Sequence, residues 1–505
     1  MSHVLTAVVQ GVDGIAIEVE VRISSQLPRV DIVGLPEAAV RESAARVRAA
    51  ITATGLRFPE RRVTVNLAPA GVPKSGAGLD LPIAIGILAA SGALEPGAVT
   101  DTALFGELAL DGRIRPVRGP LARVMAARRG GCKRAIVPAS DAPTAALAPG
   151  IEVRAAETLG AVVAHLLGSK PLPRTRPMAC DFTARAGSCL RDVHGQENAK
   201  RALEIAAAGG HGLLLCGPPG SGKTMLARRL PSLLPPLSFD EALETTLVHG
   251  VASHDPEQKR LCMERPFRAP HHSATRSGLL GGGSPPVPGE VSLAHRGVLF
   301  LDELAEFERR TLESLRQVLE ERRVTVTRAR YSCVFPAHFH FVAATNPCPC
   351  GWFRSGTRDC RCDDATIARY RRKLSGPLLD RIDAHVTVPP VTWAQLNETP
   401  RGRTSHDVRQ RIIAARETQS RRGVASNSEI PDARLDELVM ATPDARQLLG
   451  RAVDRFQLSA RAARRVLRLA RTIADLNDEE KVDPAAVAEG LGYRDEMARG
   501  ALSGP

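Results

Sequence analysis

The segment GPPGSGKT, residues 217–224, constrains the fold of this chain more than any other stretch. It follows the apolar run GLLLC and precedes MLARRL, which gives the strand, glycine-rich loop and helix order of a P-loop. Glycines let backbone N–H groups curl around a phosphate, and the start of the helix adds partial positive charge. We therefore expect an α/β core that binds a nucleotide. The residues around the phosphates would be Gly217, Pro218, Pro219, Gly220, Ser221 and Gly222.

The side chains for nucleotide chemistry follow in order along the chain. Lys223 would reach the β and γ phosphates of ATP, and the Thr224 hydroxyl would ligate Mg²⁺. The apolar strand VLFL delivers Asp302, which would hold Mg²⁺ through water, and Glu303, which would polarise the attacking water as a general base. A second apolar strand ends at Asn346, which could position that water or could be an ordinary turn asparagine. The sequence thus predicts a Mg²⁺-dependent ATPase.

Two arginines are candidates for contact with the γ-phosphate. Arg381 in SGPLLDRID either forms a surface salt bridge at a helix end or, in a ring ATPase, reaches the nucleotide of the neighbouring subunit. Arg461 opens a series at near-helical spacing with Arg464, Arg468 and Arg471, and most such series form a solvated face. We single out Arg461, at the start of that helix, as a second γ-phosphate contact.

The 505 residues suggest about three domains of ~150 residues each. Strand-like and helical stretches alternate over residues 1–168, which predicts an α/β unit. Residues 169–180 contain three prolines and are expected to form an extended linker. Residues 181–392 would form the ATPase core with a parallel sheet, and 393–505 a helical lid.

The composition indicates an acidic partner. The formal charge is +13 and the sequence pI is about 9.7, although an arginine-rich solvated surface would give the same balance. Aromatic residues make up only 3%, which favours phosphate contacts over base stacking. The first residues lack the pattern of a signal peptide, and the longest apolar run, Leu81–Gly92, contains a proline and is too short for a bilayer. We expect a cytoplasmic protein without a membrane partner.

Four of the ten cysteines form the pattern C-x-C, nine residues, C-x-C. Their thiolates would suit a structural, tetrahedral Zn²⁺, and reduced thiols without metal are the alternative. The four are Cys348, Cys350, Cys360 and Cys362. His271 and His272 lack a third ligand at suitable spacing, so we expect them to pack in a loop or to contact phosphate rather than to hold a metal.

The segment NLAPAGVPKSGAGLDLPIA, residues 66–84, resembles the active-site segment of the Lon peptidase domain. Alignment on that pattern puts Gly78 near the nucleophilic serine and Leu121 at the place of the lysine, while Ser75 lies on the wrong side of the turn. A Ser–Lys dyad needs both groups within hydrogen-bond reach, so we expect a Lon-protease-like scaffold without peptidase activity. A basic run nearby would suit phosphate contacts or form a solvated face: Arg123, Arg128, Arg129 and Lys133.

Together these motifs resemble an AAA+ ATPase of the magnesium-chelatase-like branch and, with residues 1–168, the ComM family, also called YifB. The resemblance rests on GQENAKRALEIAAAGGHGLLLCGPPGSGKTMLA, PHHSAT, PGEVSLAHRGVLFLDE, ATNPCPCG and KLSGPLLDRID. It implies an extra loop from about Arg268 to Val291 and a β-hairpin, RRVTVTRARYSCVFPA, with Arg328 and Arg330 near its turn. Both insertions would face a central pore, where these arginines are candidates for DNA contact.

The resemblance implies an ATP-driven DNA motor. It would be a ring, most simply a hexamer, that acts as a branch-migration helicase on single-stranded, forked or branched DNA in homologous recombination during natural transformation. One alternative is the ATPase subunit of a metal chelatase, or another AAA+ remodelling factor, since such subunits resemble residues 181–505 but lack the N-terminal module. The other is a Lon-type protease, against which the missing dyad and the reversed domain order count.

Overall fold

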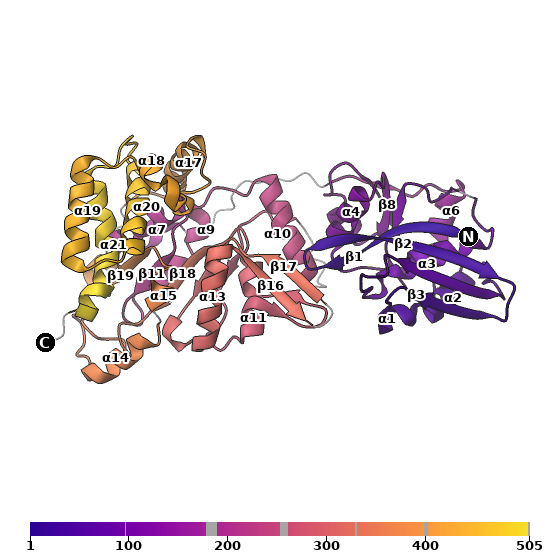
Figure 1. The fold of residues 1–505 in the computed structure, drawn as a ribbon, viewed down its shortest axis with the longest axis horizontal. Helices are drawn as coiled ribbons and strands as arrows, with labels where there is room; N and C mark the ends of the chain where they lie inside the picture. The colour runs from indigo at the N-terminus through magenta and orange to yellow at the C-terminus, as the bar shows by residue number, and fades with distance from the viewer. Residues whose placement is uncertain are drawn as a thin grey trace.

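The computed structural model describes residues 1–95, 97–177, 189–252, 261–328, 331–374, 376–397 and 402–502, with the backbone alone from 495 onward. The molecule is elongated. An α/β unit built from the first part of the chain lies at one end, a second α/β unit lies in the middle, and a group of helices lies at the other end (Figure 1). None of the described helices combines the length and the apolar character needed to cross a membrane.

The N-terminal unit contains a mixed eight-stranded sheet with the order β10-β9-β8-β5-β1-β2-β4-β3. Its strands are β1 (Ser2–Gln10), β2 (Asp13–Ser24), β3 (Arg29–Val33), β4 (Arg62–Ala68), β5 (Thr102–Leu104), β8 (Arg134–Pro138), β9 (Glu152–Ala156) and β10 (Arg174–Thr175). A small hairpin is formed by β6 (Glu107–Leu108) and β7 (Ile114–Arg115). The helices are α1 (Ala38–Arg41), α2 (Ser43–Ala53), α3 (Asp80–Ala90), α4 (Pro120–Arg129), α5 (Ala142–Ala145) and α6 (Leu159–Leu166).

Apolar side chains cover both faces of this sheet, because successive residues of a strand point to opposite sides. On β1, Val4 and Val8 join the cluster that contains α3, whereas Leu5 and Ala7 join the one that contains α4. The alternation of strands and helices predicted an α/β unit, and the structure confirms it. Part of the stretch expected to be a linker belongs to the sheet, because β10 pairs with β9 in antiparallel register.

The middle unit is built on a parallel five-stranded sheet with the order β12-β15-β18-β11-β19. Its strands are β11 (Leu213–Cys216), β12 (Phe267–Arg268), β15 (Val298–Leu301), β18 (His340–Thr345) and β19 (Ala384–Thr387). The helices are α7 (Glu197–Gly209), α8 (Lys223–Ala227), α9 (Leu230–Leu233), α10 (Phe239–Ala252), α11 (Arg276–Leu280), α12 (Glu290–Leu293), α13 (Arg309–Glu321), α14 (Asp364–Arg372) and α15 (Gly376–Leu379). Because all five strands run the same way, the segments that follow β11, β15 and β18 meet at one edge.

Two hairpins project from this unit. One is formed by β13 (Gly281–Gly282) and β14 (Val287–Pro288), and the other by β16 (Arg323–Arg328) and β17 (Tyr331–Pro336). They lie in the extra loop and in the hairpin segment that the family resemblance implies. Figure 1 shows β16 and β17 on the side of the core that faces the N-terminal unit.

The C-terminal region is helical, as predicted. It comprises α16 (Trp393–Asn397), α17 (Ser405–Arg421), α18 (Leu435–Val439), α19 (Pro443–Phe456), α20 (Ala460–Leu476) and α21 (Pro484–Leu502). Val466, Ala470 and Ile473 of α20 share one apolar cluster with α7 and strand β11 of the core. The arginine series on α20 is not a uniform solvated face. Arg471 is fully buried and donates to the carbonyl oxygens of Val439, Glu479 and Glu480, so it stabilises the helical region from inside.

Candidate functional site

The P-loop forms a backbone cradle at the carboxyl edge of the five-stranded sheet. Gly220 and Gly222 have φ values of +76° and +92°, which favour glycine. A Cβ on Gly217 would overlap the carbonyl oxygen of Val388, so this position also requires glycine. The loop can therefore present its N–H groups to a phosphate, and the residues present fit ATP.

Lys223 is held inside the cradle. Its Nζ donates to the carbonyl oxygens of Gly217 at 2.7 Å and Pro218 at 2.9 Å, and to Asn346 Oδ1 at 3.2 Å. Burial lowers the pKa of Lys223 below its usual value. The structure thus brings Asn346, from the end of β18, to the P-loop lysine.

A hydroxyl and two carboxylates complete this edge. Thr224 Oγ1 donates to Asp302 Oδ2 at 2.6 Å, so both predicted Mg²⁺ ligands are adjacent. These hard oxygen donors suit Mg²⁺, which prefers carboxylate and hydroxyl oxygens. Glu303 has a left-handed backbone with φ of 51°, and its side chain is 53% exposed. It is therefore accessible to solvent.

His272, which the sequence analysis expected to pack in a loop or to contact phosphate, lies beside the predicted general base. Its Nδ1 lies 3.2 Å from Glu303 Oε2, and its ring stacks against that of His271 with centroids 4.0 Å apart. The histidine comes from the segment that follows β12, the edge strand next to β15. The PHHSAT motif marked the segment, but only the side-chain contact in the structure shows that the ring of His272 reaches the carboxylate.

Arg381 lies at the opposite edge of the sheet, just before β19. Its guanidinium pairs with Glu320 and donates to the Pro377 carbonyl oxygen at 2.7 Å. It borders a cavity of about 140 Å³ together with Arg465 and Arg468 of α20. Strand β11 has 4 residues, so at 3.3 Å per residue this edge is roughly 13 Å from the P-loop edge. Arg381 therefore lies at the edge of the sheet that is remote from its own P-loop.

Arg461 lies in the first turn of α20 and is exposed. No contact within the described ranges joins it to the P-loop. Its neighbour Arg465, one turn further on, pairs with Asp383 instead, and Arg464 donates to Asp432 at 2.6 Å. The role of Arg461 at a γ-phosphate stays a prediction.

The four clustered cysteines converge on one point. Cys348 Sγ lies 3.4 Å from Cys350 Sγ and 3.7 Å from Cys360 Sγ, and the last two sulfurs are 3.6 Å apart. All four sulfur atoms, including that of Cys362, lie within 4.8 Å of one another. Backbone N–H groups of Trp352 and Arg361 lower the pKa of Cys350 to about 6, which favours a thiolate.

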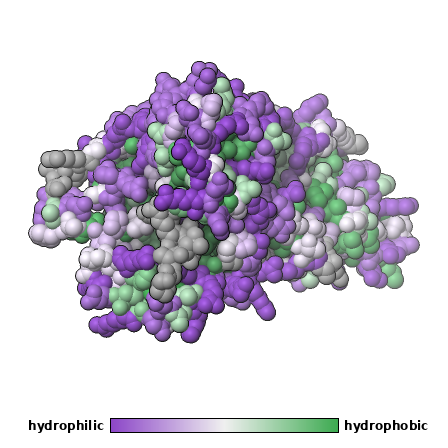
Figure 2. Space-filling model, turned by 60° about the vertical axis from the view of Figure 1, so that its left-hand side comes forward, coloured by the Kyte–Doolittle hydropathy of each residue, from purple (hydrophilic) through white to green (hydrophobic). Residues whose placement is uncertain are grey.

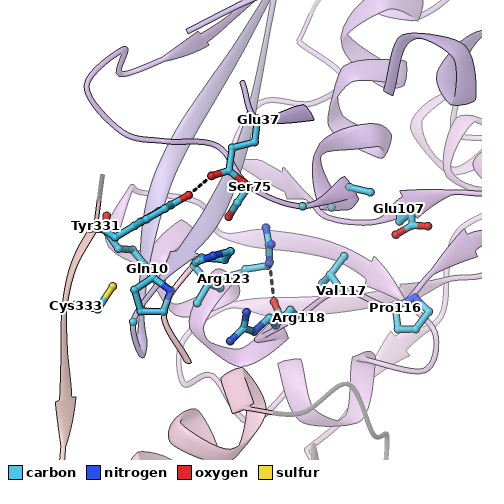
Figure 3. A pocket seen from close by; sticks show the side chains of 17 residues that line it. Gln10, Glu37, Ser75, Glu107, Pro116, Val117, Arg118, Arg123, Tyr331 and Cys333 are labelled. Atoms are coloured by element: carbon cyan, nitrogen blue, oxygen red, sulfur yellow. Dashed lines mark hydrogen bonds between the residues drawn. The ribbon is translucent and has the colours of Figure 1, made fainter. Parts of the chain in front are cut away.

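The region that resembles the Lon active site holds an arginine instead of a dyad (Figure 3). Leu121 is 2% exposed and packs in the core of the N-terminal unit. A Cβ on Gly78 would lie 3.3 Å from Arg123 Nη2. Arg123 is buried, donates to the carbonyl oxygens of Arg118 and Ala7, and has its pKa lowered to about 10 by burial. The interpretation of Arg123 as a surface phosphate contact is therefore wrong.

The other three basic residues of that run are exposed. Arg129 donates to the Gly14 carbonyl oxygen at 3.1 Å, and Lys133 pairs with Asp101 at 3.4 Å. The guanidinium of Arg128 lies over Gly150. Phosphate binding by these three surface residues stays a prediction.

The β16–β17 hairpin closes the same region from the side of the core. Together the two units enclose a cavity of about 300 Å³, lined by Ser75 and Gly78 on one side and by Tyr331 on the other. Figure 3 shows Tyr331 reaching across to Glu37, to which its hydroxyl donates a hydrogen bond. Gln10 also donates to the Ser332 carbonyl oxygen at 3.3 Å.

Of the two predicted DNA contacts, Arg328 is the last residue of β16. Arg328 is exposed, and its guanidinium lies near Gly282 of the other hairpin, so the two insertions are neighbours. Arg330 lies outside the described residues.

Figure 2 shows that the face at the helical end of the molecule carries mainly hydrophilic side chains.

Comparison with known proteins gives matches along almost the whole chain. The family described as "Magnesium chelatase, subunit ChlI" matches residues 189–396, "Subunit ChlI of Mg-chelatase" matches 19–141, and "Magnesium chelatase, subunit ChlI C-terminal" matches 402–494. The chain is 42% identical over 489 residues to competence protein ComM of Haemophilus influenzae. This alignment covers 96% of this chain and 95% of that protein. It is 43% identical over 497 residues to YifB of Escherichia coli, with 98% and 97% covered. A partial likeness, 30% identity over 168 residues, relates it to Lon protease 2 of Bacillus subtilis.

Proposed function

Because the chain belongs to the ComM/YifB family of magnesium-chelatase-like AAA+ proteins, we propose that it is an ATP-driven DNA motor of the cytoplasm. It would assemble as a ring, most simply a hexamer, and drive branch migration on single-stranded, forked or branched DNA during recombination in natural transformation. The AAA+ family implies ATP and Mg²⁺ as cofactors. The main support for the proposal is that the residues expected to act in hydrolysis lie at two opposite edges of the sheet. Lys223 and Asn346 lie at one edge, and Arg381 lies at the other.

Within one subunit, each residue of the P-loop edge has a separate task. The backbone of residues 217–222 and the Lys223 ammonium bind the phosphates, and Thr224 and Asp302 would hold Mg²⁺. When bound, Mg²⁺ neutralises negative charge on the transferring phosphoryl group. Glu303 accepts a proton from the attacking water, and Asn346 orients that water.

Between subunits, Arg381 would enter the nucleotide site of its neighbour. A guanidinium that cannot reach its own P-loop suits this role, since a ring brings the opposite edges of adjacent subunits together. Arg461 would add a second positive charge there. Hydrolysis then depends on assembly.

DNA would contact the hairpins that project from the core. Arg328, at the end of β16, is exposed beside the β13–β14 hairpin, and Arg330 follows it by two residues in the sequence. The net charge of +13 favours binding to a phosphate backbone. The name of the Haemophilus relative, a competence protein, supports a role with incoming DNA.

The test is movement of a synthetic four-way junction. ATP hydrolysis should convert the junction to its product duplexes, and Lys223→Ala, which cannot hold the phosphates, should abolish this. Changing Arg328 and Arg330 together to Ala should lower DNA-stimulated ATPase while basal hydrolysis continues. A wild-type protein that neither binds branched DNA at about 100 mM salt, where phosphate contacts still contribute, nor changes its ATPase rate in response would contradict the proposal.

The second candidate is the ATPase subunit of a metal chelatase. The descriptions of all three matching families favour it, and one of them matches residues 19–141, so the presence of an N-terminal unit does not separate the two functions as the sequence suggested. The nearly full-length similarity to ComM favours the DNA motor. A porphyrin-dependent ATPase response without a DNA response would favour the chelatase.

A further inference from the structure

The loop that carries the four cysteines forms a wall of the nucleotide site. It begins directly after Asn346 and ends at Asp363, whose carboxylate caps α14 by accepting from Thr366 N at 2.9 Å. Cys348, two residues after Asn346, is fully buried. Any change in the shape of this loop therefore acts on a residue that already contacts the P-loop lysine.

A second contact joins the loop to the P-loop itself. Gly351 has φ of +84°, and a Cβ there would overlap the side chain of Pro219. Beyond it, Phe353 and Ser355 line a cavity of about 160 Å³ whose other wall is the P-loop backbone at Gly217. The guanidinium of Arg371, from α14, lies 5.1 Å from the centre of the Phe353 ring and holds that ring in place. The loop thus lies against the first residues of the P-loop, 217–219.

The sulfur geometry identifies what could close the loop. In a tetrahedral zinc site with Zn–S bonds of about 2.3 Å, the sulfur atoms are about 3.8 Å apart. The three sulfur–sulfur separations of 3.4, 3.7 and 3.6 Å in the structure are close to this value. They are much longer than the ~2.05 Å of a disulfide bond. Four sulfurs around one point leave no open coordination position, which is typical of a structural site.

We propose that Cys348, Cys350, Cys360 and Cys362 bind one Zn²⁺ ion and that this zinc-closed loop fixes Pro219 and Asn346 in the geometry that binds nucleotide. The metal would act through the protein and not touch the nucleotide. Zinc displaces the thiol protons when it binds, and no electron transfer is involved. The inference concerns the nucleotide site alone, so it is independent of whether the chain moves DNA.

The first test measures zinc and nucleotide binding in the same samples. Full-length protein purified without chelators should contain about one zinc per chain by elemental analysis. Cys348→Ser with Cys360→Ser should lose the zinc and bind a fluorescent ATP analogue at least about tenfold more weakly. Cys262→Ser, which alters a partly buried thiol outside the cluster, should keep both properties. Absence of zinc in wild-type protein whose thiols are reduced would overturn the proposal.

The second test keeps all four ligands and avoids variants that fail to fold. Gly351→Ala and Gly356→Ala both replace a glycine of positive φ in the same loop, but only the first would push against the P-loop, since nothing lies within 4 Å of a Cβ at Gly356. Both variants should contain one zinc per chain. Gly351→Ala should bind the ATP analogue about tenfold more weakly, and Gly356→Ala should stay within about twofold of wild type.

The coupling can also be followed in the unaltered protein. A thiol-reactive mercurial should release the zinc, detected with a metal-sensitive dye, and nucleotide affinity should fall in proportion to the zinc released. Excess dithiothreitol, which takes the mercurial from the cysteines by ligand exchange, followed by re-addition of Zn²⁺, should restore both. Zinc release without a change in nucleotide affinity, or equal effects of the two glycine variants, would overturn the coupling.

Discussion

At the scale of single residues, the contact between His272 and Glu303 is the clearest addition to the predicted site. A carboxylate that takes a proton from water needs a fixed direction, and the imidazole 3.2 Å away supplies a partner for one of its oxygens. His272→Ala should lower kcat for ATP about three- to tenfold with little change in KM, which corresponds to about 0.7–1.4 kcal/mol of barrier. Steady-state ATPase assays would measure this. His271→Phe is the matched control, because it keeps a ring against His272 and removes an imidazole whose Nδ1 bonds Ser273 at 2.8 Å instead. Equal effects of the two substitutions would contradict a positioning role for His272.

A second prediction at this scale concerns Gly78 and Leu121, which stand where the Lon peptidase domain has its serine and lysine. Restoring the Lon-like residues with Gly78→Ser and Leu121→Lys should produce no ATP-dependent casein degradation. Leu121 is 2% exposed, so a lysine there would be buried, and the serine would face the Arg123 guanidinium instead of a base. The double variant should also lose about 3 kcal/mol or more of stability in denaturant unfolding. Leu121→Met, a change of similar volume, should lose less than about 1.5 kcal/mol. Casein degradation by wild-type or variant protein would show that the region still supports catalysis.

At the scale of elements, the β16–β17 hairpin lies between the core and the N-terminal unit. Tyr331 is 7% exposed, and burial raises the pKa of its hydroxyl, which stays protonated and donates to Glu37. Tyr331→Phe should speed amide hydrogen exchange in the hairpin about five- to tenfold, since a lost hydrogen bond costs about 1 kcal/mol. Val334→Ala on the same strand is the control, because that side chain is 49% exposed. Unchanged exchange in Tyr331→Phe would mean that this bond does not hold the hairpin.

The helices and strands also indicate how much of the fold and of the candidate site could be predicted from the sequence. The P-loop was found from its glycine-rich motif between a strand and a helix. Asp302, Glu303 and Asn346 were found because each follows the end of an apolar strand, and parallel strands bring such ends together. The contacts of His272, Arg123 and Tyr331 were not found, because each depends on a partner from a distant segment. No periodicity along the chain encodes that Arg123 turns inward toward Ala7 rather than outward with Arg128.

At the scale of the whole molecule, the position of Arg381 predicts that hydrolysis needs two subunits. Arg381 is roughly 13 Å from its own P-loop edge, and its side chain is 10% exposed beside Glu320. Arg381→Ala should bind ATP normally and lose about 100-fold or more in kcat, because an arginine that neutralises transition-state charge does not contribute to ground-state affinity. Glu320→Gln is the control, since it alters the partner of Arg381 but leaves the guanidinium free to reach a neighbour.

Mixing experiments distinguish this arrangement from a site within one chain. Glu303→Gln subunits bind ATP but turn it over slowly, and they carry an intact Arg381. Mixed rings place that arginine against the intact Glu303 of an Arg381→Ala subunit, so ATPase activity should rise above that of either variant alone. It should follow the mixing ratio and pass through a maximum. Such recovery requires that two chains form one nucleotide site, whereas an arginine acting inside its own subunit would give only the average of the two inactive proteins.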